Sequence, residues 1–244
     1  MRSQARSNSL PQIGQGLTCG GFATSATLRG MCGRYKVSTP GDELWETFDI
    51  HGEIQYLPPH YNIAPTQSIA IIRQPHHLEF ARWGLKLPNS KGPGINVRVE
   101  SLAAPKYRDS IRARRCLILA DGFYEWKTLG DTKKKQPYLI QRRDKKPFAF
   151  AGIWNDVVMP NGEVVAAAAI LTTTPRGVAA QVHDRMPVIL PASARNAWLD
   201  PEARFRDMLL PDVETLEIVP VGGAVNSPKN DGVECVEPAA VESP

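Results

Sequence analysis

Short apolar runs separated by turn-forming residues fill the middle of the chain. Runs rich in β-branched and aromatic residues, bounded by Gly, Pro, Asn or Asp, are typical of strands. Such runs occupy residues 68–73, 78–83, 116–120, 123–127, 138–141, 148–153, 165–173 and 216–219. The stretch 130–136, which holds consecutive lysines, is predicted to be an exposed hairpin connection.

Helix signals are fewer than strand signals. Thr39-Pro40 predicts a helix start, with the threonine hydroxyl as N-cap and proline at the first helical position. Its buried face would consist of three apolar residues, Leu44, Trp45 and Phe48. A second short helix is expected over 192–199, and Asp200-Pro201 predicts the start of a third. Because no regular strand–helix alternation is visible, we expect an α+β fold: a single domain with a mostly antiparallel, barrel-like sheet and a few peripheral helices.

The two ends of the chain differ from its middle. Residues 1–30 contain arginines but no acidic residue, and they lack apolar periodicity, so we expect a disordered extension. A transit peptide shares this composition, whereas a secretory signal would need a continuous apolar core. A further alternative, which we favour, is that translation begins at Met31. Residues 31–233 would form the domain, and the polar residues 234–244 a disordered tail.

Composition narrows the class of protein only partly. A hydrophobic content of 42% supports a core, and a net charge of +4 is compatible with a polyanionic partner without requiring one. The four cysteines show no C-x-x-C spacing, so neither a zinc knuckle nor a redox pair is indicated, and without a disulfide framework a reducing, cytoplasmic location is expected. The residues suggest no metal and no other cofactor. The apolar stretch 164–171 is far shorter than the roughly 20 residues of a membrane span, so no membrane association is expected.

Cys32, directly after Met31, is the first candidate for chemistry. If Met31 were the initiator and were removed, Cys32 would carry a free α-amine beside its thiol. The α-amine has a reference pKa near 8, against about 10.4 for lysine, so it is neutral far more often and can attack a carbonyl. The thiol could then close a five-membered thiazolidine ring and capture an aldehyde durably. On the residue alone, the alternative is an ordinary buried cysteine in a first strand.

Two other segments offer acid–base groups. In residues 121–127 the strand alternation places Glu125 between large aromatics, where partial desolvation would raise its pKa and suit it to general acid catalysis. A surface glutamate on an amphipathic strand is the alternative. His183 lies in a charged turn that leads into the apolar run 188–190, and it could complete an acid–base set or be structural.

Polar and basic residues follow at 96–115. Alternation would point Asn96, Arg98 and Glu100 to one buried-facing side, where they would need mutual hydrogen bonds or a ligand. The stretch 106–115 contains five basic residues, which form either a solvated face or phosphate contacts: Lys106, Arg108, Arg112, Arg114 and Arg115. Trp83 and Tyr107 could offer stacking surfaces for bases, and a core role is the alternative for Trp83.

Seven motifs occur in order between residues 31 and 233. They are Met31-Cys32-Gly33-Arg34-Tyr35, Tyr61-Asn62-Ile63-Ala64-Pro65, Arg82-Trp83-Gly84-Leu85, Asn96-x-Arg98-x-Glu100-Ser101, Asp121-Gly122-Phe123-Tyr124-Glu125-Trp126-Lys127, His183-Asp184-Arg185-Met186-Pro187 and Val225-Asn226-Ser227-Pro228-Lys229-Asn230-Asp231-Gly232. Together they resemble the SOS-response-associated peptidase (SRAP) family, proteins that shield abasic sites in single-stranded DNA.

The resemblance implies a role for each candidate residue. It implies that Cys32 is an N-terminal nucleophile whose amine forms a Schiff base with the sugar aldehyde and whose thiol closes a thiazolidine cross-link. Glu125 and His183 would move protons, and Asn96 would position Cys32 and the sugar. The implied DNA contacts are Arg34, Arg98, Lys106 and, as a stacking surface, Trp83. The family name adds an autopeptidase activity that would expose the cysteine.

The expected function is therefore a DNA-damage enzyme acting in the SOS response. Its expected partner is single-stranded DNA with abasic sites, it would be a monomer, and it would associate with the nucleoid when bound to DNA. The chain departs from the family in having thirty residues before Met31, which must be absent if Cys32 is to own a free amine. Two alternatives remain: a cysteine-dependent peptidase with a Cys32–His183 pair, and a non-enzymatic single-strand-binding module.

Overall fold

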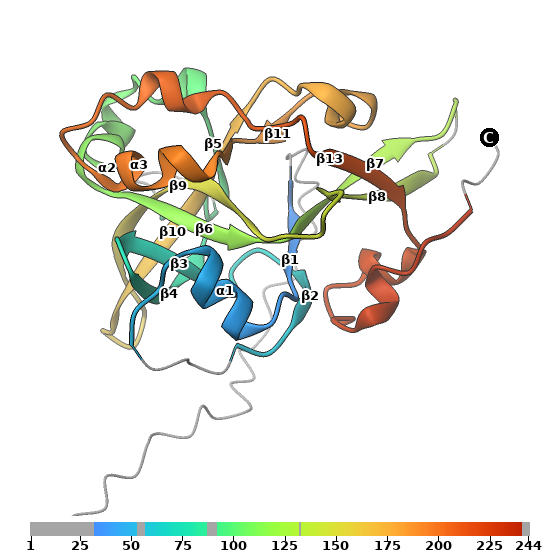
Figure 1. The fold of residues 1–244 in the computed structure, drawn as a ribbon, viewed down its shortest axis with the longest axis horizontal. Coiled ribbons are helices and arrows are strands. Elements are labelled where there is room, and N and C mark those ends of the chain that lie inside the picture. Colours follow the sequence, from blue (N-terminus) through green and yellow to red (C-terminus); the bar gives the residue numbers. More distant parts are fainter. Residues whose placement is uncertain (1–31, 53–56, 87–91, 132, 241–244) are drawn as a thin grey trace, which may run out of the picture.

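Two β-sheets make up the body of the protein (Figure 1). The structure is a computed structural model, and it describes residues 32–52, 57–86, 92–131 and 133–240. The first sheet is antiparallel throughout, with the strand order β13-β8-β7-β1-β2. These strands are β13 (Leu216–Pro220), β8 (Lys135–Arg142), β7 (Gly122–Thr128), β1 (Arg34–Val37) and β2 (His60–Ile63).

The second sheet closes on itself. Its order is β11-β10-β4-β3-β6-β9-β12, and β10 also pairs with β9, so β10, β4, β3, β6 and β9 form a closed five-stranded barrel. The β10–β4 pairing is parallel and the others in the ring are antiparallel. The bounds are β3 (Ser68–Gln74), β4 (His77–Trp83), β6 (Arg115–Ala120), β9 (Phe148–Val158), β10 (Val164–Thr173), β11 (Met186–Pro187) and β12 (Ile189–Leu190). A further strand, β5 (Asn96–Arg98), pairs in parallel with the end of β10.

The helices are short and peripheral. The α-helices of the described part are α1 (Gly41–Thr47), α2 (Arg108–Ala113) and α3 (Arg195–Leu199). Single 3₁₀ turns are η1 (Val99–Ser101), η2 (Pro105–Tyr107), η3 (Gly177–Gln181), η4 (Ala192–Ala194), η5 (Arg206–Leu209), η6 (Gly223–Asn226) and η7 (Val233–Cys235). The predicted α+β class with a barrel-like sheet is confirmed. All eight predicted strands are present, and the helix expected over 192–199 is found as η4 followed by α3.

Two helix predictions need correction. Thr39 does not cap α1: Pro40 occupies the N-cap, and the Thr39 hydroxyl donates instead to Asp121 Oδ2 at 2.8 Å. The predicted buried face of α1 is right, since Leu44, Trp45 and Phe48 are all buried.

The helix predicted to begin at Asp200-Pro201 is wrong, because that segment is a turn. Asp200 Oδ1 accepts a hydrogen bond from the Glu202 backbone N–H at 2.9 Å. The carbonyls of Asp200 and Ala203 accept from the guanidinium of Arg115. Two carbonyls that would accept backbone hydrogen bonds within a helix thus accept from the side chain of Arg115 on β6 instead.

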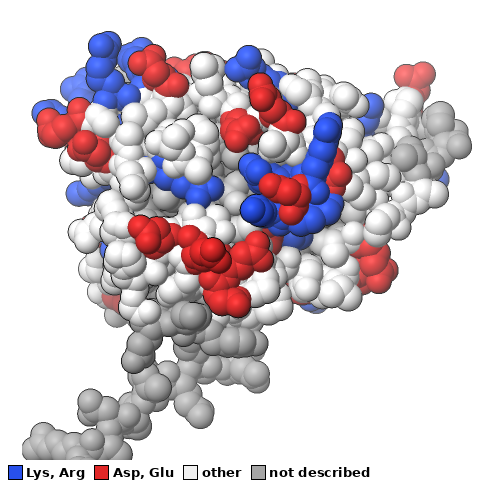
Figure 2. All heavy atoms as spheres, in the orientation of Figure 1, with Lys and Arg blue, Asp and Glu red and all other residues white. Residues whose placement is uncertain are grey.

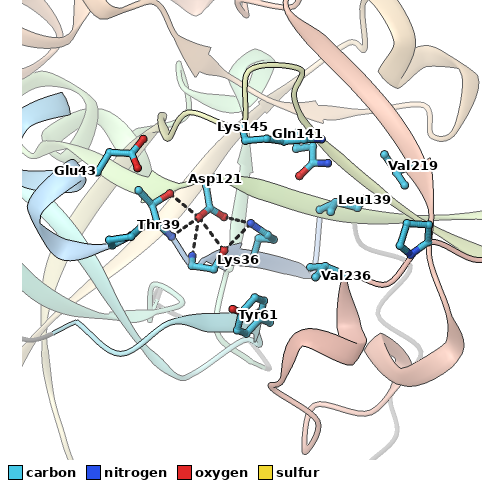
Figure 3. A pocket seen from close by; sticks show the side chains of 13 residues that line it. Lys36, Thr39, Glu43, Tyr61, Asp121, Leu139, Gln141, Lys145, Val219 and Val236 are labelled. Carbon is cyan, nitrogen blue, oxygen red and sulfur yellow. Dashed lines mark hydrogen bonds and ion pairs between the residues drawn. The ribbon is translucent and has the colours of Figure 1, made fainter.

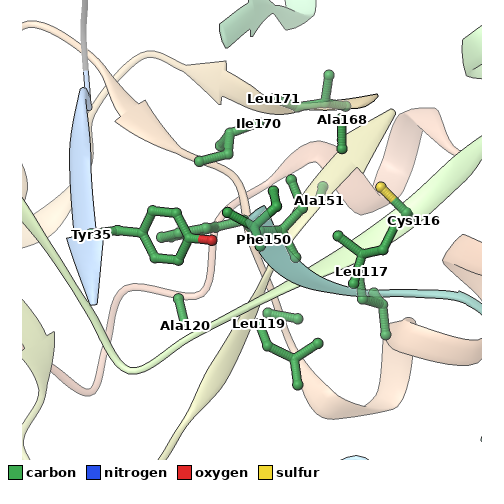
Figure 4. Close-up of a cluster of buried hydrophobic side chains, with 14 of the residues drawn as sticks. Tyr35, Cys116, Leu117, Leu119, Ala120, Phe150, Ala151, Ala168, Ile170 and Leu171 are labelled. Atoms are coloured by element: carbon green, nitrogen blue, oxygen red, sulfur yellow. The ribbon is translucent and has the colours of Figure 1, made fainter. Parts of the chain in front are cut away.

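The barrel interior forms the main core (Figure 4). The Tyr35 ring meets Trp83 and Phe150 edge-on, at centroid distances of 5.1 and 5.7 Å. Tyr35 comes from the first sheet and the other two rings from the second, so this aromatic cluster joins the sheets. Among the described helices, none combines the length and the apolar character of a membrane span.

The C-terminal segment differs from its prediction as a disordered tail. Residues 234–240 lie against the outer face of the first sheet, where Cys235 is fully buried and Val221 forms a bridge with Pro238. With Tyr124, Leu139 and Val225 they make a second, smaller core. The apolar residues of this short segment outweigh its polar composition. The predictions for residues 1–30 lie outside the described residues.

Candidate active site

Cys32 lies just before the start of β1, separated from it by Gly33, and both its N–H and its carbonyl are hydrogen-bonded. Its N–H donates to Glu125 Oε1 at 2.5 Å, and its carbonyl accepts from Asn96 Nδ2 at 3.3 Å. Its φ of +31° lies in the left-handed region, which is uncommon for a residue with a Cβ. The nitrogen that would become an α-amine is therefore already in contact with a carboxyl group.

Strand pairing explains how Glu125 reaches Cys32. The antiparallel register sets Arg34 opposite Tyr124, so the residues before β1 run alongside the second half of β7. Phe123 and Tyr124 point to opposite faces, Phe123 into the main core and Tyr124 into the second one. Glu125 follows Phe123 on the inner face and is only 3% exposed.

Burial makes Glu125 an unusually weak acid. Desolvation is the main cause that raises its pKa to about 8; the Cys32 N–H bond and Lys135 act to lower the pKa, and the charge of Asp184 adds to the rise. Near neutral pH the carboxyl group is mostly protonated, so it can donate a proton to a developing oxygen. The predicted desolvation of Glu125 is confirmed.

His183 approaches Glu125 from the second sheet. Its Nε2 lies 3.9 Å from Glu125 Oε2, and the ring is partly exposed. Its Nδ1 faces two groups: the Arg185 backbone N–H, 3.1 Å away, can donate to Nδ1 when the neutral ring carries its proton on Nε2, and Asp184 Oδ1, 2.8 Å away, can accept when Nδ1 carries the proton. Asn96 on β5 and His183 before β11 meet here because β5 and β11 both pair with the end of β10.

The thiol of Cys32 is held as a neutral group. Its Sγ lies 3.9 Å from the carbonyl oxygen of Arg34, to which it donates, and the side chain is fully buried. Burial first, and then the nearby Glu125, raise its pKa well above the ordinary value. This environment favours the thiol over the thiolate at neutral pH.

The residues expected to contact DNA fall into two groups. Arg98 and Lys106 are exposed, with Lys106 Nζ 5.0 Å from the Tyr107 ring centroid. Arg34 is partly buried, and its guanidinium donates to Asn62 Oδ1 at 2.9 Å and to the Val225 carbonyl at 2.8 Å. These hydrogen bonds, with one from Nη2 to the Asn226 carbonyl, hold residues 225 and 226 against the first sheet.

Trp83 does not offer a stacking surface, and that prediction is wrong. The side chain is fully buried, its Nε1 donates to the Ile95 carbonyl at 3.0 Å, and its ring packs on Tyr35. Tyr107 is buried as well, at 7% exposure. Alternation alone could not tell which tryptophans face the barrel interior. Trp126, one residue after Glu125, is partly exposed and bonds Asn226 Oδ1 through Nε1.

The expected inward-facing trio is also wrong in part. Within β5 the face that carries Val97 is the buried one, so Arg98 is exposed, and Glu100 is exposed in η1, after the strand has ended. Asn96 alone reaches Cys32. Glu100 is satisfied by Arg185, through two hydrogen bonds of 2.7 and 2.8 Å.

Comparison with known proteins decides the family. The model of the SOS response associated peptidase (SRAP) family matches residues 31–228. The chain belongs to the SRAP family. The abasic site processing protein YoqW of Bacillus subtilis is 38% identical over 226 residues, which cover 85% of this chain and 99% of that protein. The abasic site processing protein YedK of Escherichia coli is 30% identical over 227 residues, covering 85% and 100%.

Solved structures agree on the SRAP fold. A crystal structure of a protein from Bacteroides thetaiotaomicron superposes with a TM-score of 0.74 at 22% identity, covering 86% of this chain and 100% of that one. A second, from Bordetella bronchiseptica, gives 0.68 at 26% identity, covering 78% and 100%.

Two motifs of this SRAP chain build structure around the site. Asp121 is 2% exposed and accepts from Lys36 Nζ at 2.5 Å and from the backbone N–H groups of Ser38 and Thr39 (Figure 3). It borders a pocket of about 550 Å³ that Lys36 and Tyr61 also line. The sequence showed Asp121 only as part of a motif, and its contacts come from residues far away in the chain.

The other is the contact of Tyr61 and Asn62 with residues 227–231. Asn62 Nδ2 lies within 2.9 Å of the Ser227 carbonyl and 2.8 Å of the Asn230 carbonyl, while Asp231 Oδ1 accepts from the Tyr61 and Asn62 backbone N–H groups. The motifs around residues 62 and 231 thus form one polar network.

Charge on the visible surface is mixed. On the face drawn in Figure 2, Lys and Arg side chains are interspersed with Asp and Glu among the coloured residues. This fits the modest net charge of +4.

Proposed function

We propose that this protein captures abasic sites in single-stranded DNA through a covalent bond to Cys32, as part of the response to DNA damage. The observation that carries the proposal is the contact between the Cys32 nitrogen and Glu125, 2.5 Å apart, with a Glu125 pKa raised to about 8 and His183 behind it. Relatives that are 30 to 38% identical are named abasic site processing proteins, which supports the same substrate.

The chemistry begins with the ring-opened form of an abasic sugar, which carries an aldehyde. The neutral α-amine of Cys32 attacks the aldehyde carbon, and Glu125 protonates the resulting hydroxyl so that it leaves as water. The product is a Schiff base. The Cys32 sulfur then adds to the imine carbon while the thiol proton passes to the nitrogen, which closes a thiazolidine ring. A protonated Glu125 suits the first half, and His183 can relay its proton.

This chemistry requires that nothing precede Cys32, because an amide nitrogen cannot form a Schiff base. Translation from Met31 followed by removal of the methionine would meet this condition. Self-cleavage of the Met31–Cys32 peptide bond would meet it too: water attacks the Met31 carbonyl carbon, Glu125 and His183 transfer the protons, and the products are a carboxylate at Met31 and the α-amine of Cys32. The left-handed backbone of Cys32 supports the second route, since strain at a bond to be cut is released by cutting it.

A cysteine peptidase acting on other proteins is less well supported. Such an enzyme needs a thiol that is easily ionised by a neighbouring base. Here burial and Glu125 raise the pKa of the Cys32 thiol, and the Sγ donates to a backbone carbonyl. The amine-first reaction does not need a thiolate at the outset.

The test uses protein that begins at Cys32, verified by intact mass, mixed with a single-stranded oligonucleotide bearing one abasic site. We expect a denaturant-resistant adduct with the parent protein. Cys32→Ala and Cys32→Ser keep the α-amine and lose the thiol, so their adducts should survive denaturation only after borohydride reduction of the Schiff base.

The controls separate the alternatives. A stable adduct of undiminished yield in Cys32→Ala without borohydride would refute the proposed thiazolidine. Equal affinity for intact and abasic strands with no adduct at all would indicate a binding module. Protein whose intact mass shows that residues before Cys32 are still attached should bind the strand without forming the adduct.

A further inference from the structure

A bidentate ion pair next to the candidate site has no part in the chemistry proposed above. Arg185 Nη1 donates to Glu100 Oε1 at 2.7 Å, and Nη2 donates to Glu100 Oε2 at 2.8 Å. The same Nη2 donates to the Thr172 carbonyl at 2.7 Å. A two-point contact of this kind fixes the plane of the guanidinium as well as its position.

The pair joins two elements across the end of β10. Thr172 on β10 pairs with Arg98 of β5 on one side and with Pro187 of β11 on the other. Glu100 follows β5, and Arg185 precedes β11. The Arg185 side chain is only 12% exposed, so the contact is partly shielded from water. The hydrogen bond from Arg185 lowers the Glu100 pKa, which keeps the carboxylate ionised.

The backbone of Arg185 bears directly on His183. Its N–H donates to His183 Nδ1 at 3.1 Å, a contact that favours the neutral ring with its proton on Nε2. Nε2 is the atom 3.9 Å from Glu125 Oε2. When Nδ1 carries the proton instead, Asp184 Oδ1 at 2.8 Å can accept it. The position of the Arg185 backbone N–H therefore affects whether Nε2, the nitrogen near Glu125, carries the proton of the neutral ring.

We propose that Glu100 is a positioning residue: through Arg185 it fixes the backbone N–H that selects the Nε2–H form of His183 and aims it at Glu125. Glu100 itself touches neither Cys32 nor Glu125. The inference rests on the proposed function, because proton transfer by His183 belongs to that reaction.

The sign of the charge at Glu100 makes the inference testable. Glu100 is an exposed carboxylate near Arg98, a proposed phosphate contact. Removal of a negative charge there should leave affinity for a polyanion unchanged or make it tighter. Slower cross-linking combined with equal or tighter DNA binding would therefore separate positioning from binding.

The experiment compares Glu100→Gln with the parent in protein that begins at Cys32. We expect the single-turnover cross-linking rate to fall about five- to tenfold and its pH profile to change, with no loss of single-strand affinity. In a His183→Ala background, Glu100→Gln should have no further effect on the rate. Glu100→Asp should recover part of the rate. Asp144→Asn is the matched control, because it breaks another bidentate pair, with Arg142, and should leave the rate unchanged.

A second measurement does not depend on DNA. Ring ¹⁵N chemical shifts of His183 report its tautomer in the free protein, and Glu100→Gln should move the population away from Nε2–H. Unchanged shifts, or an equal loss of rate with and without His183, would overturn the inference. Absence of any adduct in the parent would instead refute the proposed function, while the shifts would still decide the role of Glu100.

Discussion

At the scale of single residues, the local environment of Glu125 governs its chemistry. The aromatic neighbours of Glu125 in the sequence predicted that its carboxyl group is partly desolvated, and the structure confirms that it is buried. The sequence could not reveal that the Cys32 nitrogen supplies its hydrogen bond, since the two residues are 93 positions apart. For Trp83 the predicted role itself was wrong, because the sequence cannot tell whether an aromatic residue stacks on bases or packs in the core.

A protonated buried carboxyl makes stability depend on pH. The Glu125 pKa is about 8 in the folded protein and 4.5 as its ordinary value, so between these values the folded state binds more protons than the unfolded state. Stability should fall as pH rises through this window, by at most about 5 kcal/mol. Glu125→Gln keeps an acceptor oxygen and cannot ionise. Its free energy of unfolding relative to the parent should therefore rise from pH 5 to pH 8 in urea titrations.

Parallel stability curves for the two proteins across this range would contradict the raised pKa. Glu163→Gln is a suitable control, because Glu163 is exposed and its substitution should not alter the pH dependence.

At the scale of elements, strands were predicted better than helices. Alternation and β-branched content identify the barrel strands directly, because each strand must fill the core with one or both faces. Helix starts were inferred from Thr-Pro and Asp-Pro pairs, but distant residues can bond to the capping hydroxyl or to the backbone carbonyls that a helix would use. Asp121 claims the Thr39 hydroxyl, and Arg115 claims the carbonyls that a helix after Asp200 would need.

Close strand contacts inside the barrel should make Gly152 on β9 intolerant of a side chain. A Cβ there would lie 2.8 Å from both Cys116 Sγ and Ile118 Cδ1. Both neighbours are fully buried, so they have little room to move. Gly152→Ala should lower the free energy of unfolding by about 1 to 3 kcal/mol. Thermal or urea unfolding measures this.

Gly222→Ala serves as the control for that substitution. Nothing lies within 4 Å of the added Cβ, and the φ of −67° suits alanine. A loss of stability at Gly222 as large as that at Gly152 would show that close packing is not the cause.

At the scale of the whole molecule, the fold class followed from the sequence but the joining of the two sheets did not. β9 and β10 are consecutive strands, but barrel closure also depends on the parallel pairing of β10 with β4, and no local pattern specifies a partner so distant in sequence. The tail from residue 234 was misread for the same reason, since Cys235 packs in the second core and Pro238 forms a bridge with Val221. The candidate site residues were identified because they fall in ordered motifs, and their convergence follows from the sheet junction.

Asp231 should be the main polar contact that holds residues 221–240 to β2 of the first sheet. Its carboxylate accepts from the Tyr61 and Asn62 backbone N–H groups at 2.7 and 2.8 Å and contacts His60 Nδ1 at 2.7 Å. Asp231→Ala leaves these backbone donors without that partner, which costs about 1 to 3 kcal/mol where they are buried. Hydrogen exchange over residues 221–240 should become faster.

The exposed Asp207 provides the comparison for Asp231. Asp207→Ala should leave exchange over 221–240 at the parent rate. Unaltered exchange in Asp231→Ala would mean that the apolar contacts of Cys235 and Val225 hold the segment without the carboxylate.

The short contact between the Cys32 nitrogen and Glu125 changes character if the chain before Cys32 is lost. As a peptide amide, the nitrogen is uncharged and faces a carboxyl group that burial keeps protonated. As an α-amine, it can take up that proton, and the two groups become an ammonium and a carboxylate in direct contact. One proton would then be shared between nucleophile and acid, so the amine could attack only by returning it to Glu125. Release of the N-terminus would thus set the protonation state of the enzyme for its first reaction.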